Sequence, residues 1–232
     1  MRYQAVLFDM DGTVLDTLAD LTNAVNHIME LYKMPRRSPQ EVASFLGNGA
    51  AALLRMSAAP NTPEEQLTEM LRVYQPWYDS HCAVFTAPYP GILALMQSLR
   101  AAGVKQAVIS NKQDSAVRRL AAAHFPGLLE TAVGESVTVR RKPNPDAVLA
   151  ALREMRLAPA DAVYVGDTEV DLRTAENAGL ACAVVGWGFR TEQQLRAAGA
   201  VRIFHSAGEL GEWLLSDRCS LTAASRIGSS QA

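Results

Sequence analysis

Short runs of apolar residues, separated by longer stretches of mixed character, set the pattern of this chain. Five of these runs are nearly continuous: "AVLF" (5–8), "KQAVIS" (105–110), "ETAV" (130–133), "AVYVG" (162–166) and "ACAVVG" (181–186). Strands of a parallel sheet that is covered on both faces have this pattern, because nearly every side chain of such a strand is buried. We therefore predict five parallel β-strands at these positions.

Helical patterns separate most of these predicted strands. Apolar residues recur every three to four positions in four segments: 91–103, 114–125, 145–157 and 171–180. The first segment stops at Gly103, and glycine commonly follows the last turn of a helix. Strands that alternate with helices form βαβ units. The predicted fold class is therefore α/β, a doubly wound, Rossmann-like parallel sheet.

The segment between the first and second predicted strands breaks this alternation, because residues 18–82 hold no strand-like run. Apolar spacing there predicts four helices, at 18–32, 39–46, 49–56 and 61–80. We expect Thr62 to cap the last of these and Pro63 to occupy its first turn.

This helical segment is too long for an ordinary loop, since loops between a strand and its helix run to only about 2–6 residues. We predict a helical cap domain at 18–82 that is inserted into an α/β core domain made of 1–17 and 83–215. The polar, small-residue-rich stretch 216–232 is expected to be a flexible tail.

Composition and charge narrow the class of protein. The 232 residues are 49% hydrophobic, ample for a core, and a formal net charge of −2 without a basic run argues against a nucleic-acid partner. No stretch approaches the ~18 apolar residues of a membrane span, and the first apolar run is too short and too early broken by an acid for a signal peptide. Cys82, Cys182 and Cys219 show neither metal nor disulfide spacing. We expect a cytoplasmic protein with no membrane association.

Two acidic residues follow the first predicted strand, in "DMDGT" (9–13). Alternate residues of an extended chain share a face, so Asp9 and Asp11 point the same way while Met10 points toward the core. They lie at the carboxyl end of a parallel strand, where open α/β sheets bind their ligands. Gly12 allows a sharp turn and Thr13 offers a hydroxyl. A surface turn explains one acid and the glycine, but not two acids on one face.

A second acidic pair follows the fourth predicted strand, in "GDTEVD" (166–171). If a helix begins near Thr168, Asp167 and Asp171 lie on one face of its first turn. Acids are favourable at any helix N-terminus, so this pair alone is weak evidence for a functional site. It supports such a site only because it lies at the same edge of the sheet as Asp9 and Asp11. Four carboxylates would repel one another there unless a cation intervened. Their oxygen atoms, without a nearby His or Cys, favour Mg²⁺.

Polar residues also accompany two further predicted elements. Ser110, Asn111 and Lys112 come at the end of the second strand, and Lys142 precedes a predicted helix. A hydroxyl and a fixed ammonium suit the oxygens of a phosphoryl group. Taken alone, Ser110 is more often a turn residue, and the basic run that starts at Arg140 is more often a solvated charge cluster.

Together, four motifs resemble those of the haloacid dehalogenase (HAD) superfamily: "DMDGT" (9–13), "SN" (110–111), "KP" (142–143) and "GDTEVD" (166–171). The similarity extends from Tyr3 to about Leu215, and the helical insertion resembles the small cap of that superfamily. Within it, "FLGNGAAALL" (45–54) and "APYPGILALMQSLRAAG" (87–103) are most similar to the phosphoglycolate phosphatases. The resemblance implies that the first strand is central, between the second and the fourth.

The resemblance also implies catalytic roles. Asp9 would be the nucleophile that forms an aspartyl-phosphate, and Asp11 the general acid and then the general base. Ser110 and Lys142 would hold the phosphoryl oxygens.

Further residues are implied to bind the metal or the substrate. The expected Mg²⁺ ligands are Asp9, Asp11 through its backbone carbonyl, Asp167 and Asp171, the last of which would support either the metal or the lysine. The residues expected beside the phosphate are Gly12, Thr13 and Asn111.

The sequence thus predicts a Mg²⁺-dependent phosphatase of a small phosphorylated metabolite, with 2-phosphoglycolate as the first candidate, acting as a monomer or homodimer. A β-phosphoglucomutase-like phosphomutase or a pyrophosphatase would share the motifs and differ in the cap. A response-regulator receiver also has acids after its first strand and a phosphorylated Asp, but its two acids are usually adjacent and it has no helical insertion, so this sequence fits it less well. A non-catalytic, phosphate-binding relative would be expected to lack a motif residue, and none is missing.

The predicted cap contains one candidate for substrate contact. Asn48 stands between two glycines ahead of a predicted helix, whose N–H groups could bind a small carboxylate, and a plain glycine-rich turn explains the pattern equally well. Residues 14–17 and 83–87 are expected to act as hinges of the cap. For Trp187 and Phe189, after the fifth strand, core packing is preferred over a place at the site.

Overall fold

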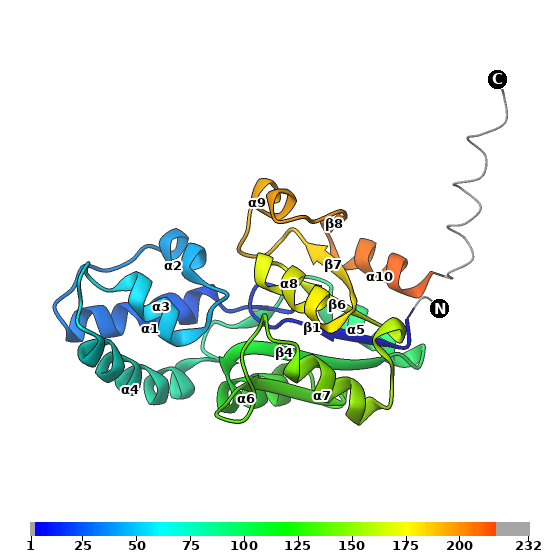
Figure 1. The fold of residues 1–232 in the computed structure, drawn as a ribbon, viewed down its shortest axis with the longest axis horizontal. Coiled ribbons are helices and arrows are strands. Elements are labelled where there is room, and N and C mark those ends of the chain that lie inside the picture. The colour runs from blue at the N-terminus through cyan, green and yellow to red at the C-terminus, as the bar shows by residue number, and fades with distance from the viewer. Residues whose placement is uncertain (1–2, 217–232) are drawn as a thin grey trace, which may run out of the picture.

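The computed structural model describes residues 3–216, in which helices cover both faces of a parallel sheet (Figure 1). Within this range the sheet has six strands in the order β5-β4-β1-β6-β7-β8. Their bounds are β1 Ala5–Phe8, β4 Lys105–Gln113, β5 Thr131–Glu135, β6 Ala162–Gly166, β7 Ala181–Val185 and β8 Ile203–Phe204. The α/β fold class, the five predicted strands and the central place of β1 between β4 and β6 are confirmed.

Alternate residues of β1 pack on opposite faces of the sheet. Val6 and Phe8 belong to a buried apolar cluster with helices α5 (Ile92–Ala101), α6 (Asp114–His124) and α10 (Ala207–Leu215). Ala5 and Leu7 pack instead with α7 (Asp146–Met155) and α8 (Glu169–Ala178). Because both faces are covered, the whole strand is buried, which explains its continuous apolar run.

Three elements near the end of the described chain were not predicted: α9 (Glu192–Ala197), β8 and α10. Strand β8 has two residues, which is too short for a periodic pattern. Helix α10 does carry a signal, because its buried Leu210 and Leu214 lie four residues apart on one face.

The predicted start of the long helix is wrong. Helix α4 spans Glu64–His81, and Pro63 occupies its N-cap position. The hydroxyl of Thr62 donates to the carbonyl of Ala59 (2.7 Å) and so closes a separate turn before the helix.

Helices α1 (Leu18–Leu31), α2 (Pro39–Phe45), α3 (Gly49–Ser57) and α4 follow β1 in the chain and gather to one side of the sheet (Figure 1). Where the chain enters and leaves this group, strands β2 (Leu15–Asp16) and β3 (Ala87–Pro88) form an antiparallel pair. The four helices lie close to their predicted positions. The domain boundaries at 18–82, and the hinges at 14–17 and 83–87, stay predictions.

A buried carboxylate reinforces this junction. Asp20, in the first turn of α1, is 2% exposed. It accepts hydrogen bonds from the backbone N–H groups of Val84, Phe85 and Thr86 and from the Thr86 hydroxyl, at 2.8 to 3.1 Å. One side chain of the helical group therefore fixes the segment that returns to the sheet.

Within residues 3–216, no helix has both the length and the apolar character to cross a membrane. Cys82 and Cys182 are free thiols in this range. Cys219 and the predicted tail, apart from Ser216, lie outside the described residues.

Candidate active site

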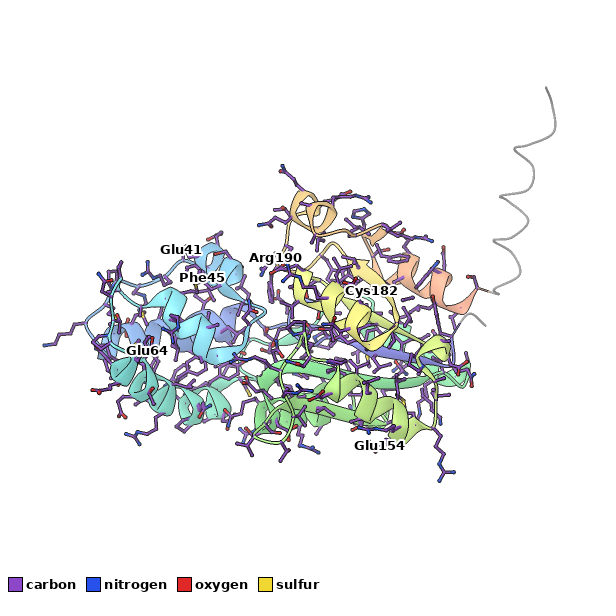
Figure 2. The ribbon with its side chains drawn as sticks, viewed as in Figure 1. Glu41, Phe45, Glu64, Glu154, Cys182 and Arg190 are labelled. Atoms are coloured by element: carbon purple, nitrogen blue, oxygen red, sulfur yellow. The ribbon has the colours of Figure 1, made fainter. Side chains whose placement is uncertain are left out.

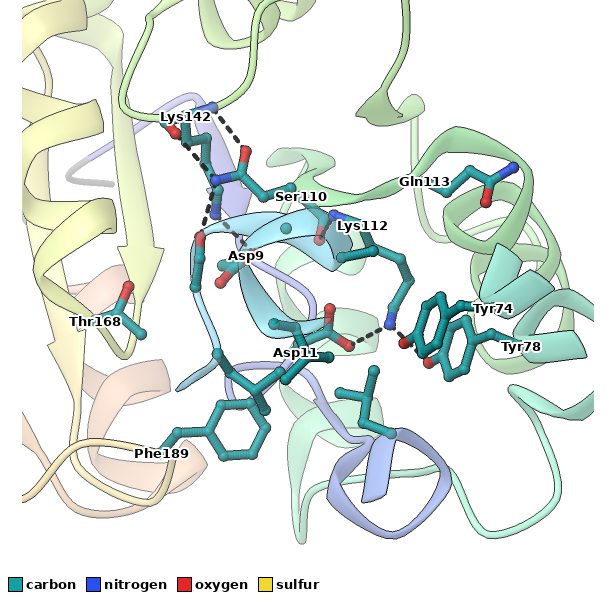
Figure 3. A pocket seen from close by; sticks show the side chains of 17 residues that line it. Asp9, Asp11, Tyr74, Tyr78, Ser110, Lys112, Gln113, Lys142, Thr168 and Phe189 are labelled. Atoms are coloured by element: carbon teal, nitrogen blue, oxygen red, sulfur yellow. Dashed lines mark hydrogen bonds and ion pairs between the residues drawn. The ribbon is translucent and has the colours of Figure 1, made fainter. Parts of the chain in front are cut away.

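The carboxyl ends of three neighbouring strands bring the predicted polar residues to one edge of the sheet. Asp9 follows β1, Asp167 follows β6, and Ser110 lies in β4, which runs further than predicted. Asp9 and Ser110 line a cavity of about 60 Å³ that α3 and α4 close from the other side (Figure 3). A water molecule needs roughly 10–15 Å³ on this measure, so the cavity fits only a small ligand.

Three buried acids form a cluster at this edge. Asp9, Asp167 and Asp171 each place a carboxylate oxygen within 4.8 Å of the others. Burial first, and then the negative charge of Asp171, raises the pKa of Asp167 to about 7. The same two causes hold the pKa of Asp9 well above its usual range. The cluster is therefore an unfavourable place for three negative charges alone.

The donor set of this cluster fits a hard divalent cation. All three side chains offer carboxylate oxygens, which Mg²⁺ and Ca²⁺ prefer over nitrogen or sulfur. A cation between them would offset the repulsion that raises the pKa of Asp9 and Asp167.

Lys142 supplies a buried positive charge to the same cluster. Its ammonium pairs with Asp9 (2.8 Å) and Asp171 (2.7 Å) and donates to the Tyr164 hydroxyl (3.0 Å). Burial alone would lower the pKa of Lys142, but the two carboxylates outweigh burial and raise it. Asn111 fixes the backbone of Lys142, since its amide oxygen accepts from the Lys142 N–H (2.7 Å) and its amide nitrogen donates to the Lys142 carbonyl (3.0 Å).

Asp171 and Asp167 are held by different local structures. Asp171 is the third residue of α8, and one of its oxygens accepts from both the N–H and the hydroxyl of Thr168 in a capping box. Asp167 precedes the helix and accepts from the Thr13 hydroxyl (2.9 Å) and the Phe189 N–H (2.8 Å). The predicted placement of both acids in the first turn of the helix is wrong, because Asp167 lies before it.

Gly12 and Thr13 both lie against the side chain of Asp167. Gly12 has a φ of +83°, and a Cβ atom there would lie 2.4 Å from an Asp167 carboxylate oxygen. Only glycine both adopts this positive φ readily and leaves room for the Asp167 carboxylate. Neither Gly12 nor Thr13 lines the cavity, so their predicted place beside a phosphate stays a prediction.

The side chain of Asp11 lies apart from the acidic cluster. Its carboxylate accepts from the Thr17 hydroxyl (2.7 Å) and pairs with the Lys112 ammonium (3.0 Å). It lines the cavity beside Asp9, which leaves it available for proton transfer to a ligand. The predicted contribution of Asp11 to the metal, through its backbone carbonyl, is compatible with this position and stays a prediction.

The predicted cap contact at Asn48 takes a different form. Asn48 occupies the N-cap position of α3, but its side chain makes no capping hydrogen bond, and it does not line the cavity. Its carbonyl accepts from Arg141 (2.9 Å). The flanking Gly47 and Gly49 line the cavity, and a Cβ at Gly49 would lie 2.9 Å from a carboxylate oxygen of Glu135.

Several cavity residues were not assigned a role from the sequence, among them two tyrosines, a lysine and a phenylalanine. Tyr74 and Tyr78 enter from α4, Lys112 from β4 and Phe189 from the loop after β7. The two tyrosines had only the four-residue spacing of a helix face as a signal, and Lys112 only its place in "SNK". The preferred packing is confirmed, because Trp187 and Phe189 both pack against the apolar core. Phe189 also lines the cavity, and its backbone N–H donates to Asp167.

Arg190, next along the chain, was also missed. Figure 2 shows it between α2 and the sheet. Its guanidinium pairs with Glu169 (2.9 Å) and donates to the carbonyls of Ala43 (3.1 Å) and Leu46 (2.8 Å). Only the tertiary structure brings these partners together.

A doubly wound parallel sheet with a buried acid–lysine site at its carboxyl edge defines the class of protein, an α/β enzyme that binds its ligand at the strand ends. The family model of haloacid dehalogenase-like hydrolases matches residues 6–185, and the chain belongs to this family.

Similar proteins narrow the range of activities that this chain can have. The chain is 32% identical over 191 residues to phosphoglycolate phosphatase 1 of Pseudomonas aeruginosa, covering 79% of this chain and 70% of that protein. It is 29% identical over 193 residues to N-acetylmuramic acid 6-phosphate phosphatase of the same organism, covering 82% and 84%. A solved structure of a candidate phosphoglycolate phosphatase from Lactobacillus delbrueckii subsp. bulgaricus matches with a TM-score of 0.89 and 35% identity, covering 94% of this chain and 100% of that one. The protein is therefore a phosphatase that acts on a small phosphorylated substrate.

Proposed function

We propose that the protein is a Mg²⁺-dependent phosphomonoester hydrolase that acts through an aspartyl-phosphate on Asp9, with 2-phosphoglycolate as its substrate. The observation that carries the proposal is the position of Asp9. It lines the cavity, belongs to the acidic cluster, and pairs with the buried ammonium of Lys142. A carboxylate so placed can meet a phosphoryl group whose charge the lysine and a cation offset.

In the first step, an Asp9 carboxylate oxygen attacks phosphorus and forms a new P–O bond. The ester P–O bond breaks, and its electron pair stays on the leaving oxygen, which takes a proton from the Asp11 carboxyl group. Thr17 and Lys112 hold the Asp11 side chain on the cavity side of the strand end. This geometry suits a general acid that is separate from the metal-binding acids.

In the second step, Asp11 removes a proton from water, and the hydroxide attacks phosphorus. The bond between phosphorus and Asp9 breaks, phosphate leaves, and the Asp9 carboxylate is restored. Lys142 stays between Asp9 and Asp171 and holds the phosphoryl oxygens together with the Ser110 hydroxyl.

Asp9, Asp167 and the Asp11 carbonyl would hold Mg²⁺, while Asp171 keeps Lys142 in place. The metal, when bound, supplies positive charge beside the phosphoryl oxygens. Ca²⁺ is expected to inhibit, because its looser coordination disturbs in-line geometry. Full activity after exhaustive chelation would contradict the metal requirement.

The small cavity supports a small substrate, and the similarity to phosphoglycolate phosphatases supports 2-phosphoglycolate. A sugar phosphate is the second candidate, because the N-acetylmuramic acid 6-phosphate phosphatase is a relative of similar identity. A phosphomutase or pyrophosphatase activity is a third. The cytoplasmic location and the monomeric or homodimeric state stay predictions.

The test is a comparison of kcat/KM for 2-phosphoglycolate, N-acetylmuramic acid 6-phosphate, β-glucose 1-phosphate and pyrophosphate with Mg²⁺. We expect 2-phosphoglycolate to be hydrolysed fastest. A hundredfold preference for another compound would refute the substrate and leave the mechanism in place.

A further inference from the structure

We propose that Lys112, Tyr74 and Tyr78 form a subsite for a carboxylate on the leaving group, so that the enzyme selects phosphomonoesters with an acid group next to the ester oxygen. The inference rests on the hydrolysis proposed above and defines the substrate class by its chemistry. It concerns side chains from β4 and α4 that meet only in the folded molecule.

The cavity has two differently charged ends. Among the described residues that line it, Lys142 and Lys112 carry a positive charge. Lys142 is already paired with Asp9 and Asp171. Figure 3 shows Lys112 at the other end, beyond Asp11 and against the two tyrosines.

The ammonium of Lys112 has one donor to spare. The side chain is buried, and it donates to the Tyr78 hydroxyl (2.7 Å) and pairs with Asp11 (3.0 Å). An ammonium has three N–H donors, and within residues 3–216 Tyr78 is its hydrogen-bond partner and Asp11 its ion-pair partner. A buried cation with an unused donor at a cavity wall favours an anionic ligand.

The two tyrosines add neutral donors beside this cation. Tyr74 and Tyr78 are each 3% exposed, and their rings stack with centroids 5.5 Å apart. Burial raises the pKa of both phenols, so both keep their protons. The Tyr78 oxygen accepts from Lys112, and no described residue accepts the hydroxyl hydrogen of either tyrosine. One ammonium and two phenols can therefore donate to the two oxygens of a carboxylate.

The distances select where that carboxylate sits on the substrate. Asp11 meets the leaving oxygen in the proposed mechanism, at a hydrogen-bond distance of about 2.7 Å. The Lys112 ammonium and the Thr17 hydroxyl both contact Oδ1 of Asp11, so Oδ2 is the oxygen that donates the proton. The Lys112 nitrogen, 3.0 Å from Oδ1, therefore lies no more than about 8 Å from the leaving oxygen. A carboxylate on the carbon that bears the phosphate has its oxygens roughly 3–4 Å from the ester oxygen, which places them within this span, where Lys112 can donate to them.

Four apolar residues of the cavity wall disfavour a sugar. Leu21, Leu46, Ala50 and Leu53 line the cavity and offer no side-chain hydrogen-bonding group to a row of hydroxyls. A sugar ring would leave hydroxyls without partners against these residues, which is unfavourable. The subsite therefore favours a short acidic leaving group over a polyol.

The experiment measures the preference for an acid over a neutral analogue of the same length. We would determine kcat/KM for 2-phosphoglycolate and for ethyl phosphate, with Mg²⁺, in the wild type and in Lys112→Met, Tyr74→Phe and Tyr78→Phe. The wild type is expected to prefer the acid. Lys112→Met should lower the acid-to-neutral ratio about ten- to a hundredfold, the usual effect of losing a charge-assisted hydrogen bond, and each Phe variant several-fold.

Lys105→Met is the matched control, because Lys105 begins the same strand and donates to the Met155 carbonyl (2.7 Å), away from the cavity. The acid-to-neutral ratio of kcat/KM in Lys105→Met should equal that of the wild type. Equal slowing of both substrates in Lys112→Met, with an unchanged ratio, would overturn the subsite and leave Lys112 a role toward Asp11 alone.

A binding measurement separates this inference from the proposed function. Calorimetric Kd values for the same two compounds are measured in the Asp9→Asn background, with and without Lys112→Met. If the wild type hydrolyses neither compound, the proposed function fails, and the Kd ratio still decides the subsite. A Kd ratio near one in the Asp9→Asn protein would overturn the subsite whatever the activity.

Discussion

At the scale of single residues, Asp9 is the position on which the proposed chemistry depends. Asp9→Asn keeps the shape of the side chain but removes the nucleophilic charge, so we expect kcat to fall by at least about 10⁴-fold. Thermal unfolding followed by circular dichroism should show a folded variant, because the amide still accepts from the Met10 N–H (2.7 Å in the wild type). Activity within tenfold of the wild type would remove Asp9 from the role of nucleophile.

Asp167 gives a second prediction at this scale, for the metal-free protein. Its pKa, raised by burial and by Asp171 to about 7 against an ordinary value of 3.8, means that the folded state holds a proton that the unfolded state loses. Stability should therefore fall as the pH rises from about 4 to 7. Added Mg²⁺ should raise the Tm strongly at pH 8 and weakly at pH 5, because the cation needs the ionised form.

Asp167→Asn is the control for this titration. An amide cannot ionise, so the variant should lose part of the pH slope and be more stable than the wild type at pH 8 without metal. An unchanged slope of Tm against pH in the variant would show that another group causes it.

At the scale of elements, Asp20 joins α1 to the segment that returns to the sheet. Asp20→Ala leaves the N–H groups of Val84, Phe85 and Thr86 without their acceptor, in a buried place. We expect a loss of about 2–4 kcal/mol in the free energy of unfolding, measured by urea titration. Glu154→Gln, at an exposed position of α7 (Figure 2), should change it by less than about 0.5 kcal/mol. Equal effects of the two substitutions would contradict a structural role for Asp20.

At the scale of the whole molecule, side chains from the sheet side donate to backbone carbonyls of the helical group. Arg190 binds the carbonyls of Ala43 and Leu46, while Asn111 donates to the carbonyl of Gly47 (2.9 Å). Since Asn111 also fixes the backbone of Lys142, one side chain contacts both the helical group and the segment that carries this lysine.

Arg190→Met tests these contacts. Loss of the guanidinium should raise hydrogen exchange in residues 42–49 and lower kcat/KM roughly tenfold, while Arg190→Lys should recover part of the activity. Arg153→Met, at an exposed position of α7, is the control and should change neither quantity. Unchanged exchange in Arg190→Met would show that these contacts do not hold the cap closed.

The sequence alone was sufficient for the five long strands, the helices between them and the inserted helical group, because apolar periodicity reports burial directly. It also located the acids, since polar groups at the ends of apolar strands stand out against their surroundings. Lys142 lies in a basic run before a helix, and its role came from the resemblance to the HAD superfamily. Strand β8 escaped prediction because two residues carry no period. The Thr62 cap failed because Thr62 closes a separate turn onto Ala59, and helix α4 begins one residue later than a Thr62 cap requires, with Pro63 at its N-cap position.

The tertiary structure decided which of these residues meet. It separated the Asp11 carboxylate from Asp9, Asp167 and Asp171, and it gave Asp11 to Lys112 instead. It also brought Tyr74 and Tyr78 from α4 to the end of β4, and Arg190 to the carbonyls of α2. A one-dimensional pattern shows whether a side chain is buried, but contacts between distant segments depend on how helices pack on the sheet, and that packing is fixed only when the whole chain folds.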